Sequence, residues 1–136
     1  MSTVPFQKAD GGRAASRRPR QQNDCAVRAL AIATGLPYDQ VYNDLAALGR
    51  HCSRGTPTGT IAVWLRLRSE AARHSFPAVA GQPRMHVDTF LAGPGAQGRW
   101  VVRIAGHVFA ALDGAIHDIT MPRQDACVYC AWRVNV

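Results

Sequence analysis

One cysteine stands where this chain best supports nucleophilic chemistry. Cys25 follows Asn23 and Asp24 and falls in the first turn of an apolar segment that we predict to be a helix. The unpaired backbone N–H groups and the positive end of the helix dipole favour negative charge in that turn. The pKa of a thiol there is lowered, so it forms the nucleophilic thiolate more readily. Cys25 is therefore the candidate nucleophile.

A histidine and an aspartate further along the chain supply the two groups that such a nucleophile requires. His107 stands at the start of an alternating apolar segment, and Asp118 follows eleven residues later. In this order the imidazole can take the thiol proton, and the carboxylate can hold the imidazole in one tautomer. We expect Cys25, His107 and Asp118 to form a catalytic triad.

A β-hairpin is the predicted means of bringing His107 and Asp118 together. Asp113-Gly114 lies between them and is typical of a two-residue hairpin turn. The two strands then run past each other, and His107 approaches Asp118 with one residue of slack or a bulge. His117 is the competing histidine, but strand alternation points it away from Asp118.

An oxyanion hole is expected beside the nucleophile. The backbone N–H of Cys25 would supply one donor, and a side-chain amide just upstream would supply the second. Gln22 is the first candidate for that amide, and Gln21 is the next.

The elements that must position these groups follow from the apolar pattern and the turn residues. We predict a buried helix over 25–34 that ends at Gly35, because glycine is typical of helix C-caps. Helices followed by an antiparallel sheet indicate an α+β fold in which the helices pack on the sheet. The other predicted elements are helices over 37–50 and from Thr60 toward Arg73, a helical turn over 86–91, strands over 100–105, 107–112, 115–118 and 128–134, and groove-forming loops over 50–60 and 75–98.

The 136 residues predict a single domain with an unusual N-terminal segment. Five basic residues and one acidic residue give the first twenty positions a net charge of +4, out of +7 for the chain. We expect residues 1–20 to form a mobile basic arm and residues 21–136 to form the folded domain. The arm would serve as a solubilising tail, or would contact nucleic acid or an acidic partner weakly through Arg13, Arg17, Arg18 and Arg20.

No segment has the length and apolar character of a membrane span, and the first ten residues lack the apolar core of a signal peptide. We therefore expect no membrane contact. The expected location is the cytoplasm of the producing cell or of a host cell.

The four cysteines raise the alternative of a zinc site. Cys127 and Cys130, with His51 and Cys52, are residue types that bind zinc. However, His51 and Cys52 are adjacent, which is poor spacing for chelation, and Cys127 and Cys130 lie in a strand-like segment whose alternate residues face opposite ways. We expect reduced thiols, with no bound metal and no cofactor.

Two segments of the chain resemble small phage-encoded proteins of the papain-like cysteine peptidase superfamily. Residues 23–30, Asn-Asp-Cys-Ala-Val-Arg-Ala-Leu, followed by Gly-Leu-Pro-Tyr at 35–38, resemble the nucleophile region of these proteins. Residues 106–118 are similar to their His-Asp hairpin, and also to that of peptidases that process bacteriocin leaders. The resemblance implies a papain-like fold, with Cys25, His107 and Asp118 as nucleophile, base and orienting acid.

Two positions depart from the pattern of that superfamily. Papain-like enzymes usually place the oxyanion glutamine six positions before the cysteine, where this chain has Pro19. A glycine follows the cysteine in many relatives, where this chain has Ala26.

The sequence is compatible with three classes of function. The first is a cysteine peptidase-like hydrolase that acts on a peptide or isopeptide bond in a peptide or protein, including a host protein. The alternative is a catalytically silent, phage-type binding protein that inhibits a host protein or contacts nucleic acid through its basic surface. A zinc-stabilised module is the third class, and it predicts bound metal.

Overall fold

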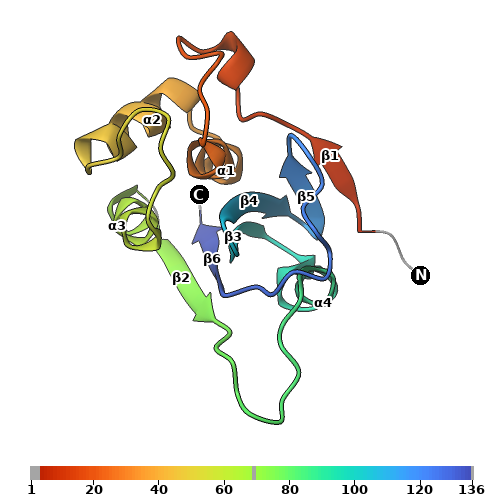
Figure 1. Ribbon diagram of the computed structural model, residues 1–136. Coiled ribbons are helices and arrows are strands. Elements are labelled where there is room, and N and C mark those ends of the chain that lie inside the picture. The colour runs from red at the N-terminus through yellow and green to blue at the C-terminus, as the bar shows by residue number, and fades with distance from the viewer. Residues whose placement is uncertain (1–3, 69, 136) are drawn as a thin grey trace.

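The computed structural model describes residues 4–68 and 70–135, which form a mixed α+β fold with helices on both faces of one sheet. Helices α1 (Cys25–Thr34), α2 (Tyr38–Ala47) and α3 (Thr58–Arg68) belong to the core on one face, and α4 (Val87–Ala92) belongs to the core on the other. Figure 1 shows α1 and α4 on opposite sides of the central strands. Short 3-10 helices lie at Arg13–Ala15 and Pro94–Ala96.

The sheet has six strands in the order β1-β5-β4-β3-β6-β2. All neighbouring strands are antiparallel except β1 and β5, which are parallel. The expected antiparallel sheet is thus confirmed for the four predicted strands, β3 to β6. Strand β2 adds an antiparallel strand that was not predicted, and β1 makes the whole sheet mixed. The strands are β1 (Phe6–Lys8), β2 (Glu70–Ser75), β3 (Arg99–Ile104), β4 (His107–Leu112), β5 (Ala115–Asp118) and β6 (Cys130–Asn135).

Helix α1 forms where the apolar pattern predicts it. Seven of its ten residues are buried, and Arg28 is the single charged residue among them. Gly35 ends the helix at φ 76°, a left-handed conformation that favours glycine, and its N–H donates to the carbonyl of Ala31. The side chain of Asp24 makes no capping bond to the helix.

The third helix ends earlier than predicted, because a strand begins where the helical pattern was expected to continue. Helix α3 ends at Arg68, and β2 pairs along its full length with β6, from Glu70 opposite Asn135 to Ser75 opposite Cys130. The segment Glu-Ala-Ala-Arg-His-Ser is poor in β-branched residues, so its own preference does not indicate a strand. The ladder with β6 decides its conformation.

The N-terminal segment also differs from the expected separate arm, over those of its residues that are described. Phe6 and Lys8 in β1 pair with Ile116 and Asp118 in β5, and the side chain of Val4 is buried. Arg13 forms an ion pair with Asp24. The boundary at residue 20 therefore does not separate an arm from the domain. Charge and glycine content alone do not reveal an edge strand that pairs across 110 positions of sequence.

Strand alternation divides the buried residues into two clusters. Val108 and Ala110 of β4 pack toward α1, whereas Phe109 and Ala111 pack toward α4. The first cluster fixes the start of α1 against β4, which is the contact that positions the site. Among the described residues, no helix combines the length and apolar character needed to cross a membrane.

Candidate active site

The predicted hairpin brings His107 and Asp118 into direct contact. Leu112 pairs with Ala115 across the two-residue turn, and the register continues regularly to Ala110 opposite His117. His107 Nε2 lies 2.6 Å from Asp118 Oδ2. The expected proximity is confirmed, and the paired residues of this hairpin contain no bulge.

Cys25 completes the predicted arrangement from the first turn of α1. Its side chain is half-buried and forms hydrogen bonds with the imidazole of His107 and with the backbone N–H of Val108. Because Asp118 occupies Nε2 of His107, Nδ1 is the ring nitrogen left for the sulfur. The three residues predicted as a triad therefore form one chain of hydrogen bonds.

The pKa shifts of Cys25 and His107 both favour the charged form of each group. Hydrogen bonds to Asp118 and then to Cys25 raise the pKa of His107 from 6.5 to about 9, although burial opposes the shift. Burial raises the pKa of Cys25, but the hydrogen bonds from His107 and Val108, and the charges of His107 and Arg28, outweigh it and lower that pKa below 9.0. The arrangement stabilises a thiolate beside an imidazolium.

Asp118 is held as a buried carboxylate by three donors. Its side chain is 2% exposed, and Oδ1 accepts hydrogen bonds from Arg28 Nη1 at 2.6 Å and from the N–H of Ile119 at 2.7 Å. Burial alone would raise its pKa, but His107, Ile119 and Arg28 lower it overall. The backbone carbonyl of Asp118 also accepts a hydrogen bond from the N–H of Ala9, so the N-terminal segment helps to hold the backbone of this residue in place.

A second buried carboxylate lies one residue before the candidate nucleophile Cys25, and sequence reasoning missed its role. Asp24 accepts hydrogen bonds from Arg28 Nε at 3.1 Å, Tyr38 Oη at 2.7 Å and Arg13 Nη1 at 3.0 Å. Arg28 thus bridges Asp24 and Asp118. The available signal was a single arginine inside an otherwise apolar helix, since a buried charge requires a partner.

The candidate oxyanion side chains lie close to Cys25 in sequence, but their observed contacts differ. Gln21 Oε1 accepts from the N–H of Ser53 at 2.7 Å and from Arg50 Nη2 at 3.2 Å. Gln22 is exposed, and its side chain forms no hydrogen bond with another described residue. Its role in an oxyanion hole stays a prediction.

The other three cysteines, Cys52, Cys127 and Cys130, belong to no candidate metal site in the described part of the chain. Within the described residues, no group of three or more His, Cys, Asp or Glu side chains is placed to hold a metal ion. Cys130 is buried and Cys127 half-buried. Cys52 is exposed, and hydrogen bonds from Tyr42, Gln21 and Ser53 lower its pKa to about 7, a reactivity that its sequence context did not indicate.

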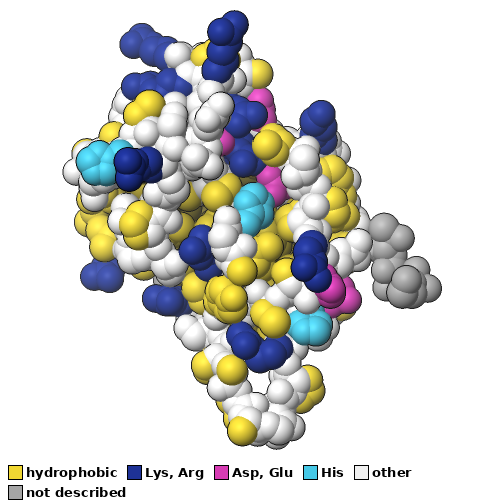
Figure 2. Space-filling model, viewed as in Figure 1, with side chains coloured by type: hydrophobic (Ala, Val, Ile, Leu, Met, Phe, Trp, Pro, Cys, Tyr) yellow, Lys and Arg dark blue, Asp and Glu magenta, His cyan; other side chains and the backbone are white. Residues whose placement is uncertain are grey.

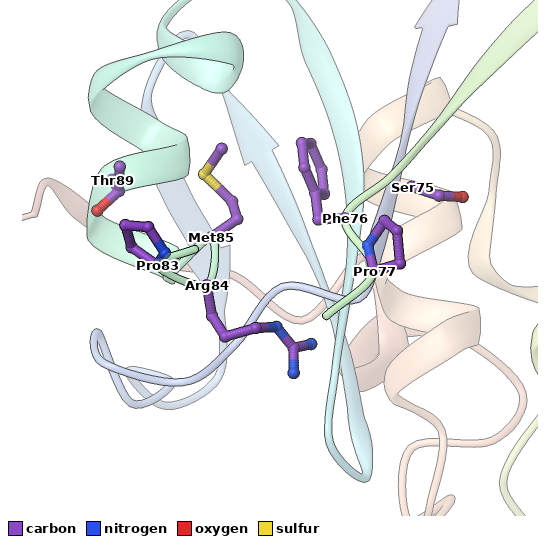
Figure 3. A pocket seen from close by; sticks show the side chains of 7 residues that line it. All are labelled: Ser75, Phe76, Pro77, Pro83, Arg84, Met85 and Thr89. Carbon is purple, nitrogen blue, oxygen red and sulfur yellow. The ribbon is translucent and has the colours of Figure 1, made fainter. Parts of the chain in front are cut away.

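A cavity of about 410 Å³ lies at the same end of the sheet as His107. Its wall begins at Ser75 and Phe76, where β2 ends, three strands away from β4. Three strand spacings correspond to about 14 Å. Figure 3 shows the side chain of Arg84 extending from the Met85 side of this cavity toward the Pro77 side. The other lining residues are Pro83 and Thr89.

The face seen in Figure 2 carries a histidine near its middle, with hydrophobic side chains around it and Lys or Arg side chains further out.

The four basic residues expected to contact nucleic acid differ in how far their side chains are held by other residues. Arg13 and Arg18 form ion pairs with Asp24 and Asp39, and Arg18 also lies over a tyrosine ring. Arg17 and Arg20 are exposed.

Comparison with known proteins identifies no relative. No protein-family model matches the chain, and no curated protein or solved structure gives a significant match.

Proposed function

We propose that this protein is a thiol hydrolase that cleaves a peptide or isopeptide bond with Cys25, His107 and Asp118. The proposal depends above all on the continuous hydrogen bonding from the Cys25 sulfur through the imidazole to a buried carboxylate. A half-buried structural thiol requires no imidazolium partner, and a surface histidine requires no buried aspartate. Their combination with a lowered thiol pKa favours catalysis.

The first half of the proposed reaction forms a thioester. The Cys25 thiolate attacks the carbonyl carbon, and the C=O electron pair moves to the oxygen, where the backbone N–H of Cys25 stabilises it. The tetrahedral intermediate collapses and the C–N bond breaks. The His107 imidazolium gives its proton to the leaving amine.

The second half hydrolyses the thioester. Neutral His107 takes a proton from water, whose oxygen attacks the thioester carbonyl carbon. Collapse of the second tetrahedral intermediate breaks the C–S bond and releases the acid. Cys25 returns as thiolate beside the protonated His107, and Asp118 stabilises that imidazolium in both halves.

The arrangement of helix and hairpin supports a papain-like site for this proposed hydrolase. The nucleophile begins the first helix on one face of the sheet, and the histidine and aspartate lie on adjacent strands of a hairpin. The loop before α3 and the segment around the cavity near Phe76 would form the walls of a substrate groove.

Alkylation of each cysteine by iodoacetamide, mapped by mass spectrometry from pH 5 to pH 10, tests the proposed nucleophile. The background is Cys52→Ser, because that exposed thiol has a pKa of about 7 and would compete. Cys127 is half-buried like Cys25 and serves as the internal reference. We expect Cys25 to react faster than Cys127 at pH 7. Each unit by which a variant raises the pKa of Cys25 lowers its thiolate fraction about tenfold.

The matched variants are His107→Ala and His117→Ala. The first removes the imidazole that is hydrogen-bonded to Cys25, and the second removes a histidine on the neighbouring strand β5. Only His107→Ala should abolish the faster alkylation of Cys25 relative to Cys127. If Cys25 reacts no faster than Cys127, the hydrolase proposal fails, and the catalytically silent binding protein becomes the better account.

A further inference from the structure

We propose that Arg103 binds a carboxylate of the substrate next to the scissile bond, so that the preferred substrate is acidic at that position. The proposal rests on the proposed hydrolase function and names its substrate class. Arg103 lies on β3, has no part in the proposed triad, and was not singled out by the sequence.

The register of the sheet places Arg103 beside the nucleophile. Arg103 pairs with Val108 on one side and with Cys130 on the other. Paired residues of antiparallel strands project to the same face, and both partners belong to the cluster under α1. Val108 also donates its backbone N–H to Cys25. The Arg103 side chain therefore starts one strand away from the contact that holds the sulfur.

The charge of Arg103 has no partner within the described part of the protein. Its side chain is half-buried, yet its guanidinium forms no hydrogen bond, ion pair or ring contact with another described residue. Other described arginines that are at least partly buried each have such a partner: Arg13, Arg18, Arg28, Arg50 and Arg84. The nitrogens of Arg103 are not among the buried side-chain atoms that lack a partner, so solvent reaches them. A half-buried guanidinium that is open to solvent and has no protein acceptor is available to a ligand that brings negative charge.

A carboxylate is the acceptor that this position and the proposed reaction share. Guanidinium binds carboxylate with two parallel hydrogen bonds, which gives orientation as well as affinity. In a peptide or isopeptide substrate, the carboxylate comes from an Asp or Glu side chain or from the chain end. Binding it beside the sulfur would hold the neighbouring carbonyl in register with the thiolate.

A pair of small alkylating reagents tests the inference without a known substrate. Iodoacetate and iodoacetamide both react with the thiolate and lose iodide, but only iodoacetate carries a carboxylate. We expect Arg103→Gln to lower the ratio of their rates at Cys25 roughly tenfold relative to the wild type, since hydrogen bonds to charged groups have that strength. Arg103→Lys keeps the charge and should retain part of the preference. Thermal melts verify that each variant is folded.

Arg66→Gln is the matched control, because Arg66 is an exposed arginine on α3 and its loss removes the same net charge. It should keep the wild-type rate ratio. If Arg103→Gln also keeps that ratio while Cys25 remains fast, the carboxylate site is overturned and the hydrolase proposal stands. If Cys25 is unreactive toward both reagents in the wild type, the proposed function fails instead.

Peptide libraries then separate the two sources of the carboxylate. Cleavage that prefers internal Asp or Glu over Asn or Gln, and that reverses toward Lys in Arg103→Glu, identifies a side chain. Cleavage that is lost when the C-terminus is amidated identifies the chain end. Wild-type cleavage without any preference for a carboxylate contradicts the inference.

Discussion

The guanidinium of Arg28 donates a 2.6 Å hydrogen bond to the carboxylate of Asp118, and both side chains are almost completely buried. Arg28 lies three residues after Cys25 on α1, whereas Asp118 ends β5, the strand next to the one that carries His107. The bond therefore connects the helix that carries Cys25 with the hairpin that carries His107 and Asp118. The same guanidinium binds Asp24 through Nε. One cation thus pairs with two buried carboxylates and fixes the position of the helix relative to the hairpin.

We predict that Arg28→Met strongly destabilises the protein. Loss of this cation leaves two buried carboxylates without their shared partner, and breaking such buried pairs costs about 3–5 kcal/mol. Arg68→Met is the control, since Arg68 pairs with Asp44 at the surface. Exposed pairs contribute about 0–1 kcal/mol. Urea unfolding measures both, and equal losses in the two variants would contradict the bridging role of Arg28.

Asp118→Asn should shift the pH range over which the charged pair persists. The amide keeps the shape of the carboxylate but weakens its hydrogen bond to His107, which is the first cause of the raised His107 pKa of about 9, and also removes its charge. The upper inflection in Cys25 alkylation should move from near pH 9 toward the ordinary histidine value of 6.5. Asp125→Asn removes an exposed carboxylate and should leave the profile unchanged. An unchanged inflection in Asp118→Asn would contradict the assignment of Asp118 as the residue that raises the pKa of His107.

The pair predicts a specific pH dependence of stability. The pKa of His107 is raised in the folded state, so its contribution is complete below pH 6.5 and is lost as the pH rises through about 9. The pKa of Cys25 is lowered, so its contribution is present above 9.0 and is lost as the pH falls through its folded value. Where Cys25 is ionised and His107 protonated, the folded pair holds one proton. The unfolded chain also holds one there, on the thiol.

These two slopes oppose each other in the wild type wherever Cys25 is ionised in the folded protein, and Cys25→Ser should expose the histidine slope. The free energy of unfolding of the variant should fall as the pH rises above 6.5, by up to about 1.4 kcal/mol per pH unit. The wild type should show a flatter curve over the same range. Urea titrations at half-unit pH intervals provide the comparison, and parallel curves would show that no ion pair forms.

Gly11→Ala should destabilise the packing of the N-terminal segment on α1. A Cβ at Gly11 would lie 3.0 Å from the carbonyl oxygen of Arg28 and 3.2 Å from its Cα, at a backbone φ of +70°. Gly12 has a φ of +93°, but a Cβ there would lie 3.9 Å from its nearest neighbour, the Cβ of Tyr38. We expect Gly11→Ala to lose about 1–3 kcal/mol more than Gly12→Ala. Thermal melts of the two variants decide whether the close approach matters.

Cys52 should be a second reactive thiol with no role in the proposed reaction. It is exposed with a pKa of about 7, and the hydrogen bond from Tyr42 is the first cause of that shift. Tyr42→Phe should therefore slow alkylation of Cys52 at pH 7 and leave that of Cys25 unchanged. Mass spectrometry separates the two sites, and an equal slowing of both would contradict the independence of the two thiols.

The candidate site was largely predictable, because its residues carry strong local signals. The helix at Cys25 is bounded by Gly35, and the Asp113-Gly114 turn sets the register that brings His107 to Asp118. Each signal lies within a dozen residues of what it determines. The triad geometry follows once the helix packs on the hairpin.

The parts that the sequence did not reveal depend on contacts between distant residues. Strands β1 and β2 form because the edges at β5 and β6 offer unpaired backbone groups, not because their residues prefer extended backbone. The bridge from Asp24 through Arg28 to Asp118 spans 94 positions, and no local pattern encodes which carboxylates an interior arginine meets.

The parallel pairing of Lys8 with Asp118 also constrains the order of assembly during synthesis. These residues are 110 positions apart, so the pairing must wait until the ribosome has released the chain as far as Asp118. Closing so long a loop is an entropically expensive and slow step in folding. The thiol of Cys25 emerges early, without the groups that ionise it. The pKa of Cys25 would therefore be lowered only after the segment that carries His107 and Val108 has been synthesised and has packed against α1.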